Sequence, residues 1–322
     1  RIQVAGYSVS ERTNFDLTLA IMAFDKVELK LIYNADRFLG QTIETMAQHF
    51  IKALDELTGD LNRRLSEADL LSDAEKSQLL VAYNQTKTDF PKDKTLTQIF
   101  EEQVAQWPDQ TALLFGDQEV SYLELNQKAN QLALFLREKG VTPGVNVGLI
   151  LNRSCEMIVA ILGILKAGGA YLPLDPEFPP ERTVNIINDA NPKLLIIHES
   201  LLENLGKTLE SCSVSVLTIE EILTTIQGYS PENLEPVGDS NDTAYIMYTS
   251  GSTGVPKGIQ NKHYNISRVV KNVNYIDITE KDVLLQLSNY AFDGSTFDIF
   301  GALLNGAKLV LAKKETIIDA YQ

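Results

Sequence analysis

Two kinds of apolar pattern open the chain. Apolar residues alternate with their neighbours over 15–23 and again over 27–33, which predicts two paired strands, most simply a hairpin. From Ile43 to Leu57 they recur every three or four positions, which predicts an amphipathic helix with His49 on its solvated flank. Over 60–94 the periodicity weakens and charge density rises, which favours an inter-domain linker with helical pieces.

Beyond the linker, predicted strands alternate with predicted helices. The strands lie at 111–115, 145–151, 170–174, 194–198, 214–218, 243–248, 283–288 and 308–312. One helix begins at Ser121, with Glu124 at capping-box spacing, and stops at Gly140. The nearly unbroken apolar run 145–151 is typical of a strand covered on both faces. The alternation predicts an α/β fold with a doubly wound, mostly parallel sheet, whose ligands bind beyond the carboxyl ends of the strands.

A loop rich in glycine and hydroxyl groups follows the strand 243–248. It reads Thr249, Ser250, Gly251, Ser252, Thr253 and Gly254, with Lys257 after Pro256. Glycines let backbone N–H groups approach a ligand, and hydroxyl and ammonium groups add donors, so the loop is expected to hold phosphates. A flexible linker is disfavoured by the apolar strand just before the loop. A Walker loop is disfavoured because Gly258, and no Ser or Thr, follows Lys257.

Composition excludes several other classes of protein. The net charge of −15 and the isoelectric point near 4.7 would repel nucleic acid, so any phosphate must be held locally. The three histidines show no metal-ligand spacing, so we assign no metal-binding residue. The two cysteines lie far apart, which fits a reduced, cytoplasmic protein. The longest apolar run, 157–165, is about half of the roughly 20 residues that a membrane helix needs.

Several ordered segments together resemble the adenylation domains of nonribosomal peptide synthetases, which belong to the adenylate-forming superfamily. They are VSYLELNQKANQLA at 120–133, LKAGGAYLPLDPEFPPER at 165–182, YTSGSTGVPKG at 248–258 and NYAFDGSTFDIF at 289–300. Residues 1–60 are similar to the end of a condensation domain, an α+β remnant, and 61–94 to the linker that follows it. Residues 95–322 then resemble the N-terminal part of an adenylation domain, incomplete and belonging to its large subdomain.

The resemblance implies a function. Such domains activate an amino acid with ATP and Mg²⁺ as aminoacyl-AMP, and load it onto the phosphopantetheine of a carrier domain. It assigns Thr249 to Gly254 and Lys257 to the phosphates of ATP and pyrophosphate, and Asp293 to the α-ammonium group of the amino acid. Gly294 and Phe297 would line the side-chain pocket, for which a branched aliphatic substrate is the expectation. The partners implied are the carrier and condensation domains of the same synthetase. The catalytic lysine is expected downstream, so the isolated chain is expected not to adenylate.

Alternatives remain open around Asp293. A carboxylate among Tyr290, Ala291 and Phe292 needs a partner or a raised pKa, and a distant Lys or Arg would also supply such a partner. Ser295 with Asp298 is a candidate helix cap.

Phe297 suits simple core packing equally well, and His263 is expected to have a positional or surface role. Rival functions are an acyl- or aryl-CoA ligase, which would lack the carboxylate at Asp293 and the condensation-like leader, and a non-catalytic scaffold.

Overall fold

The computed structural model describes residues 14–23, 26–62, 64–249 and 256–313. They fall into two compact units that divide between Lys87 and Thr88, and each unit is considered by itself. The residues Ser250 to Gly254, which the sequence assigns to the phosphates, lie outside the described residues. No helix in the described ranges is long and apolar enough to cross a membrane.

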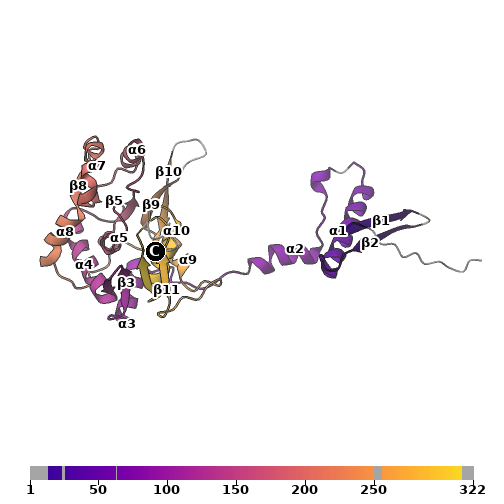
Figure 1. Ribbon diagram of the computed structural model, residues 1–322, viewed down its shortest axis with the longest axis horizontal. Helices are drawn as coiled ribbons and strands as arrows, with labels where there is room; N and C mark the ends of the chain where they lie inside the picture. Colours follow the sequence, from indigo (N-terminus) through magenta and orange to yellow (C-terminus); the bar gives the residue numbers. More distant parts are fainter. Residues whose placement is uncertain (1–13, 24–25, 63, 250–255, 314–322) are drawn as a thin grey trace, which may run out of the picture. The chain divides into compact units, whose positions relative to one another are not determined.

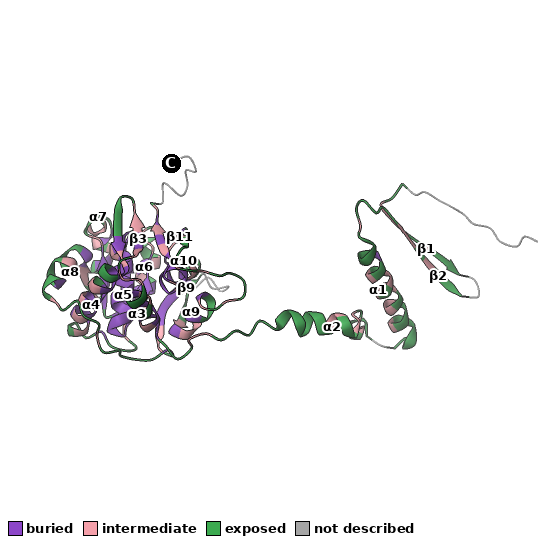
Figure 2. Ribbon diagram, turned by 90° about the horizontal axis from the view of Figure 1, so that it is seen from below, coloured by how far each residue is buried: buried purple, intermediate pink, exposed green. Residues whose placement is uncertain are grey.

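The first unit contains the predicted hairpin and helix. Strands β1 (Leu17–Ala23) and β2 (Val27–Tyr33) pair antiparallel, which confirms the hairpin. Helix α1 (Gly40–Gly59) follows, and Figure 2 shows most of its surface exposed. The segment after it contains η1 (Leu65–Glu67), α2 (Asp73–Leu80) and η2 (Ala82–Asn84).

Helix α2 is tied to α1 by a side-chain contact that the sequence did not indicate. Ser72 and Glu75 form a capping box at the start of α2. The carboxylate of Glu75 also lies 2.6 Å from Nε2 of His49, whose side chain is 34% exposed. His49 is therefore half-buried against α2, and the expectation of a solvated flank was wrong.

A six-stranded sheet forms the centre of the second unit (Figure 1). Its strands, in spatial order, are β10 (Lys257–Lys262), β9 (Thr243–Thr249), β6 (Ala170–Pro173), β5 (Asn146–Ile150), β7 (Leu194–Ile197) and β8 (Ser215–Thr218). All neighbouring pairs are parallel except β9 and β10. The sheet is thus mostly parallel, as predicted, with one antiparallel strand at its edge.

Helices cover both faces of this sheet. One apolar core joins it to α3 (Leu96–Gln106), α4 (Tyr122–Glu138) and α5 (Cys155–Ala167), and a second joins it to α6 (Pro180–Ala190) and α7 (Glu199–Glu210). Successive strand residues face opposite cores: Leu149 belongs to the first and Ile150 to the second. Both are fully buried, which explains the continuous apolar run in the sequence and confirms the doubly wound architecture.

A second sheet of four strands completes the unit. Its order is β11 (Val283–Gln286), β12 (Lys308–Leu311), β3 (Thr111–Phe115) and β4 (Gln118–Ser121), with β4 antiparallel to β3. Helix α9 (His263–Val270) connects the six-stranded sheet to this one, and helix α10 (Gly294–Leu303) connects β11 to β12 within it. The buried hydroxyl of Tyr122 donates to the carbonyl oxygen of Ala307 at 2.7 Å, so α4 helps to place β12.

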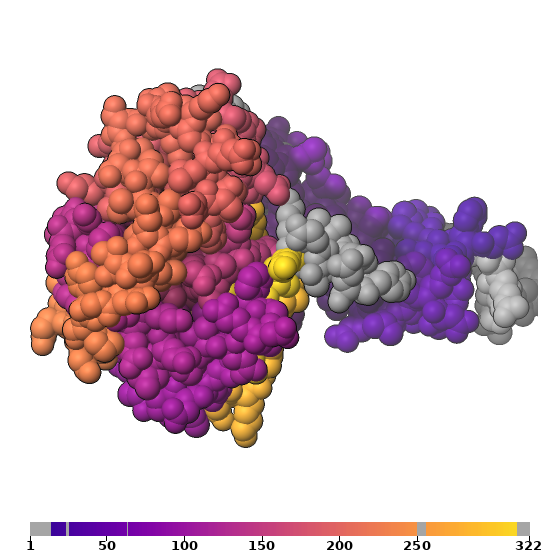
Figure 3. Space-filling model, turned by 60° about the vertical axis from the view of Figure 1, so that its left-hand side comes forward, coloured from indigo at the N-terminus to yellow at the C-terminus, as the bar shows by residue number. Residues whose placement is uncertain are grey.

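Polar side chains of α4 hold the segment that leads to β9. This segment follows α8 (Ile219–Thr225) and η3 (Ile226–Gly228). Asn130 donates to the carbonyl of Pro231 at 2.8 Å, and Gln131 donates to that of Tyr229 at 3.0 Å. Figure 3 shows this part of the chain, in orange, beside the magenta of α4. Side chains of helix α4 therefore hold the segment that leads into β9, the strand before the predicted phosphate loop.

Candidate functional site

One tyrosine fastens the segment 289–293 to the carboxyl ends of two central strands. The buried hydroxyl of Tyr290 lies 2.7 Å from the carbonyl oxygen of Leu174, after β6, and 3.0 Å from that of Leu149, in β5. It also accepts a hydrogen bond from the N–H of Leu151 at 2.9 Å. Desolvation raises the pKa of Tyr290 above its usual value, so the hydroxyl stays protonated. Sequence reasoning missed this residue, because a tyrosine reads as one more apolar position.

Two further contacts bring the same segment to the sheet. The amide of Asn289 donates to the carboxylate of Asp175, which follows β6. The hydroxyl oxygen of Thr296, in the first turn of α10, lies 3.0 Å from the hydroxyl oxygen of Tyr245 on β9. Since β6 and β9 are parallel neighbours, the start of α10 lies close to the strand that leads into the phosphate loop (Figure 1). The segment that carries Asp293 and the described end of β9 therefore both lie by the carboxyl ends of neighbouring parallel strands.

Asp293 is exposed at the start of α10. Its carboxylate makes no hydrogen bond or ion pair with any residue that the structure describes, and it does not cap the helix. The apolar surroundings expected for this carboxylate are not seen, because Asp293 is exposed. Pairing with a Lys or Arg is likewise not seen among the described residues. Asp293 is thus available to a ligand, and its charge contributes to the raised pKa of Tyr245, which burial dominates.

The predicted cap at Ser295 and Asp298 was also wrong. The buried hydroxyl of Ser295 donates backwards, to the carbonyl oxygen of Phe292 at 2.7 Å. Asp298 instead accepts from the N–H groups of Leu287 and Ser288, at 3.1 and 2.8 Å. Asp298 therefore ends β11 and fixes the path toward Tyr290.

An arginine that the sequence analysis did not single out supports this turn from the other side. Arg153, just after β5, donates to the carbonyl oxygen of Leu287 at 2.6 Å. Desolvation lowers the pKa of Arg153, while the nearby charges of Asp298 and Asp175 raise it. The two carboxylates thus stabilise the charged form of the partly buried Arg153 near the strand ends. No local sequence signal marks Arg153, because the carbonyl groups that it binds, of Leu287 and Ala312, are more than one hundred residues away.

The pocket residues Gly294 and Phe297 lie on the first turns of α10. Gly294 is exposed, and a Cβ placed there would lie 2.8 Å from Oγ of Ser288. Phe297 is half-buried, packs against the main core and lies 6.4 Å from the ring of Tyr275. Phe297 therefore serves packing at least in part. It lies about one helical turn after Asp293.

The described ends of the phosphate loop form an antiparallel pair. Thr249, the last residue of β9, lies opposite Lys257, the first residue of β10, and both are exposed. Lys257 makes no ion pair with a described residue. The paired strands hold the two ends of the loop together, and place a hydroxyl and an ammonium group at its base. Among the described residues, no cluster of three His, Cys, Asp or Glu could hold a metal ion, so we assign Mg²⁺ no ligand here.

His263 serves the structure and lies away from the solvent. It is 3% exposed, and its Nδ1 lies 3.2 Å from the N–H of Leu96, the first residue of α3. Desolvation lowers its pKa to about 4, against an opposing effect of Asp242 and Asp239. A neutral imidazole accepts the hydrogen bond, so His263 satisfies an otherwise unpaired donor at a helix start. The positional role that the sequence suggested fits this geometry.

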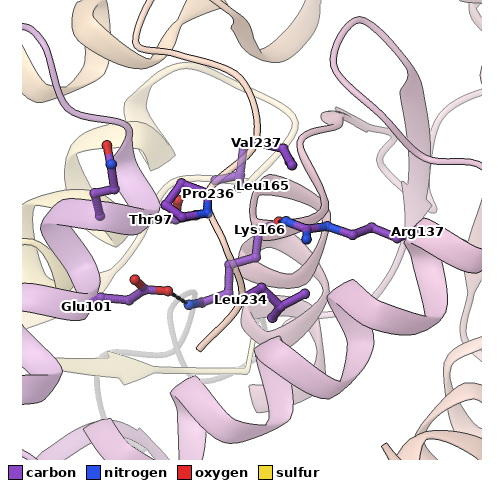
Figure 4. A pocket seen from close by; sticks show the side chains of 9 residues that line it. Thr97, Glu101, Arg137, Leu165, Lys166, Leu234, Pro236 and Val237 are labelled. Atoms are coloured by element: carbon purple, nitrogen blue, oxygen red, sulfur yellow. Dashed lines mark hydrogen bonds and ion pairs between the residues drawn. The ribbon is translucent and has the colours of Figure 1, made fainter. Parts of the chain in front are cut away.

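A small pocket elsewhere in the second unit contains a buried ion pair. Figure 4 shows Lys166, at the end of α5, reaching Glu101 on α3, with Arg137 and Leu234 beside them. The Lys166 side chain is 2% exposed and that of Glu101 is 21% exposed. Desolvation lowers the pKa of Lys166, while Glu101 opposes this shift. The pair joins α3 to α5, and none of these pocket residues was among the predicted site residues.

Comparison with known proteins agrees with this architecture. Residues 100–321 match the family model described as AMP-binding enzyme, and residues 2–80 match the condensation domain. The chain belongs to the AMP-binding enzyme family.

The preceding condensation-domain match gives the chain the arrangement of a nonribosomal peptide synthetase. Bacitracin synthase 1 of Bacillus licheniformis is 47% identical over 322 residues, which are 99% of this chain and 6% of that protein. Gramicidin S synthase 2 of Brevibacillus brevis is 43% identical over 312 residues, which are 97% of this chain and 7% of that protein.

Solved structures show the same fold. The nonribosomal peptide synthetase FmoA3 superimposes with a TM-score of 0.73 at 28% identity, over 95% of this chain and 32% of that one. It has also been solved with AMPPNP bound. The N-terminal subdomain of NpsA from Klebsiella oxytoca superimposes with a TM-score of 0.62 at 27% identity, over 69% of this chain and 56% of that one.

Proposed function

We propose that this chain takes part in the ATP-dependent activation of an amino acid as aminoacyl-AMP, which is then loaded onto a phosphopantetheinyl carrier. The observation that carries the proposal is the unpartnered carboxylate of Asp293. It lies on a segment fastened to the strand ends by Tyr290, beside the strand that leads into the phosphate loop. Because the chain spans about 6% of bacitracin synthase 1, the activity is proposed for a larger synthetase that carries this sequence.

The proposed reaction is a substitution at phosphorus. A carboxylate oxygen of the amino acid attacks the α-phosphorus of MgATP, and the bond from that phosphorus to the bridging oxygen breaks. Pyrophosphate leaves with the electron pair. Thr249, the loop Ser250 to Gly254 and Lys257 are proposed to hold the departing phosphates, whose charge grows in the transition state. Asp293 holds the α-ammonium group, and Gly294 and Phe297 border the side chain, for which we keep a branched aliphatic substrate as the proposal.

We also propose how the parts of the chain divide this work. Residues 1–60 are the structural end of a condensation domain, 61–94 join it to adenylation, and 95–322 form the N-terminal part of the adenylation domain. The isolated chain is proposed to bind nucleotide without adenylating.

Substitution of Asp293 tests the function. Because Asp293 is exposed before the substrate arrives, its contact with the ammonium group is expected to have the strength of a hydrogen bond to a charged group. This is worth about 1.5–3 kcal/mol, or roughly 10- to 150-fold. We expect Asp293→Ala to lower kcat/KM for the amino acid by that factor in amino-acid-dependent ATP–pyrophosphate exchange.

Asp277→Ala is the matched control, because it removes an equally exposed carboxylate shortly before β11. It is expected to leave the exchange unchanged. Normal exchange by the Asp293 variant would refute the proposed role of this carboxylate. Exchange by the wild-type synthetase that no amino acid stimulates would refute the proposed function itself.

A further inference from the structure

A second cation lies at the end of β9. Arg182 is the third residue of α6, and its Nη2 lies 3.5 Å from the carbonyl oxygen of Tyr248, the residue before Thr249. The central carbon of its guanidinium lies 4.3 Å from the centre of the Phe178 ring. The ring supports one face of the guanidinium and leaves its edge for other partners.

Most of the donors of Arg182 have no partner among the described residues. A guanidinium carries five N–H donors. The contact with Tyr248 is at the outer limit of a hydrogen bond, and Nε is buried without a partner among the described residues. The carboxylate of Asp189, further along α6, is engaged by the hydroxyl of Tyr248. A buried donor without an acceptor is unfavourable, so an anion that meets this guanidinium would gain from it.

Arg182 and Lys257 lie on opposite faces of β9. Residues directly opposite in an antiparallel pair share a face, so Lys257 shares the face of Thr249. The neighbouring side chain of Tyr248 points to the other face and packs in the core beneath α6, where Arg182 lies. The strand that leads into the predicted phosphate loop therefore ends between two cations.

We propose that Arg182 is a second cationic ligand for the β- and γ-phosphates of ATP and for pyrophosphate, acting together with Lys257 from the opposite face of β9. This rests on the proposed function. The net charge of −15 repels a polyphosphate in general, so local cations must overcome that repulsion. The planar guanidinium fits two phosphate oxygens at once, which an ammonium group does not. Because AMP lacks the β- and γ-phosphates, Arg182 is expected to favour ATP and pyrophosphate over AMP.

The test compares two variants that make the same change in net charge. Arg182→Met removes the cation at the strand end but keeps an apolar stem against Phe178. Lys193→Met removes an exposed cation just before β7, at the amino end of that strand, whereas Arg182 lies by the carboxyl end of β9. Isothermal titration calorimetry on the 322-residue chain measures the Kd of ATP, pyrophosphate and AMP for each protein. Thermal unfolding checks that each variant is folded, and Arg182→Gln replaces Arg182→Met if the latter does not fold.

We expect Arg182→Met to raise the Kd of ATP and of pyrophosphate about tenfold, the effect of one charge-assisted contact. The Kd of AMP should change less than about twofold, and Lys193→Met should leave all three values close to the wild type. Pyrophosphate affinity equal to that of the Lys193 variant overturns the inference, and so does an equal loss for ATP and AMP. A wild-type chain that binds neither ATP nor pyrophosphate counts against the proposed function together with this inference.

Discussion

Removing one oxygen atom, by Tyr290→Phe, should destabilise the second unit. Without the hydroxyl, the N–H of Leu151 and the carbonyl oxygen of Leu174 lose the partner that the structure gives them. Leu149 keeps a partner, because its carbonyl oxygen also accepts from the N–H of Leu174 at 2.8 Å. Each buried group left unsatisfied costs about 1–3 kcal/mol. Two such groups lower the free energy of unfolding by about 3 kcal/mol, which corresponds to a fall in Tm of roughly 6–12 °C.

Urea and thermal unfolding of the wild type and Tyr290→Phe measure this loss. Tyr264→Phe is the control, because the structure gives that hydroxyl no hydrogen bond among the described residues. We expect the control to change the free energy of unfolding by less than about 0.5 kcal/mol. In the synthetase, Tyr290→Phe should also raise the KM for the amino acid more than the KM for ATP, since Asp293 follows three residues later. Equal stability of the two variants would refute the role assigned to the Tyr290 hydroxyl.

Two further predictions concern buried charge in the second unit. Because the pKa of His263 is lowered to about 4 while an unfolded histidine titrates near 6.5, the unfolded state binds more protons between these values. The free energy of unfolding should therefore fall as the pH drops from 6.5 to 4. The fall should be larger in the wild type than in His263→Gln, by up to about 3 kcal/mol. If urea unfolding gives a difference in this free energy between the two proteins that does not vary with pH, the prediction is contradicted. Glu101→Gln leaves the Lys166 ammonium, 2% exposed, without its counter-charge and should cost about 3 kcal/mol. Lys166→Met should lower the free energy of unfolding by less, because the Glu101 carboxylate still reaches water. Equal losses for the two variants in urea unfolding would contradict the explanation that the buried ammonium needs its counter-charge.

The central strands could be predicted because burial on both faces leaves a simple signal. The run around Leu149 and Ile150 is apolar at every position, since each face of the sheet has its own core. The edge strands β4 and β10 were missed. Their sequences, QEVS and KGIQNK, are mostly polar, because an edge strand has one partner and more contact with water. Strand propensity is weak evidence where little is buried.

The candidate site could be predicted by residue type and less well by geometry. Motifs single out the loop after β9 and Asp293 as candidates, but they do not predict the exposed environment of Asp293. The same spacing rule that correctly predicts the cap at Ser121 fails at Ser295, because Asp298 finds backbone donors at the end of β11 instead. Local sequence can state that a carboxylate needs a donor, but a contact made by folding decides which donor it meets.

Strand β10 has a consequence for the behaviour of the protein at high concentration. Among the described strands it pairs with β9 alone, so its outer edge presents free backbone groups to the solvent. Lys257 and Lys262 stand at its two ends, and positive charge on an edge strand opposes pairing with a strand of another molecule. We therefore expect Lys257 to oppose self-association, in addition to its proposed role with the phosphates. Neutral substitutions at Lys257 bring a cost in solubility that is separate from any effect on phosphate binding.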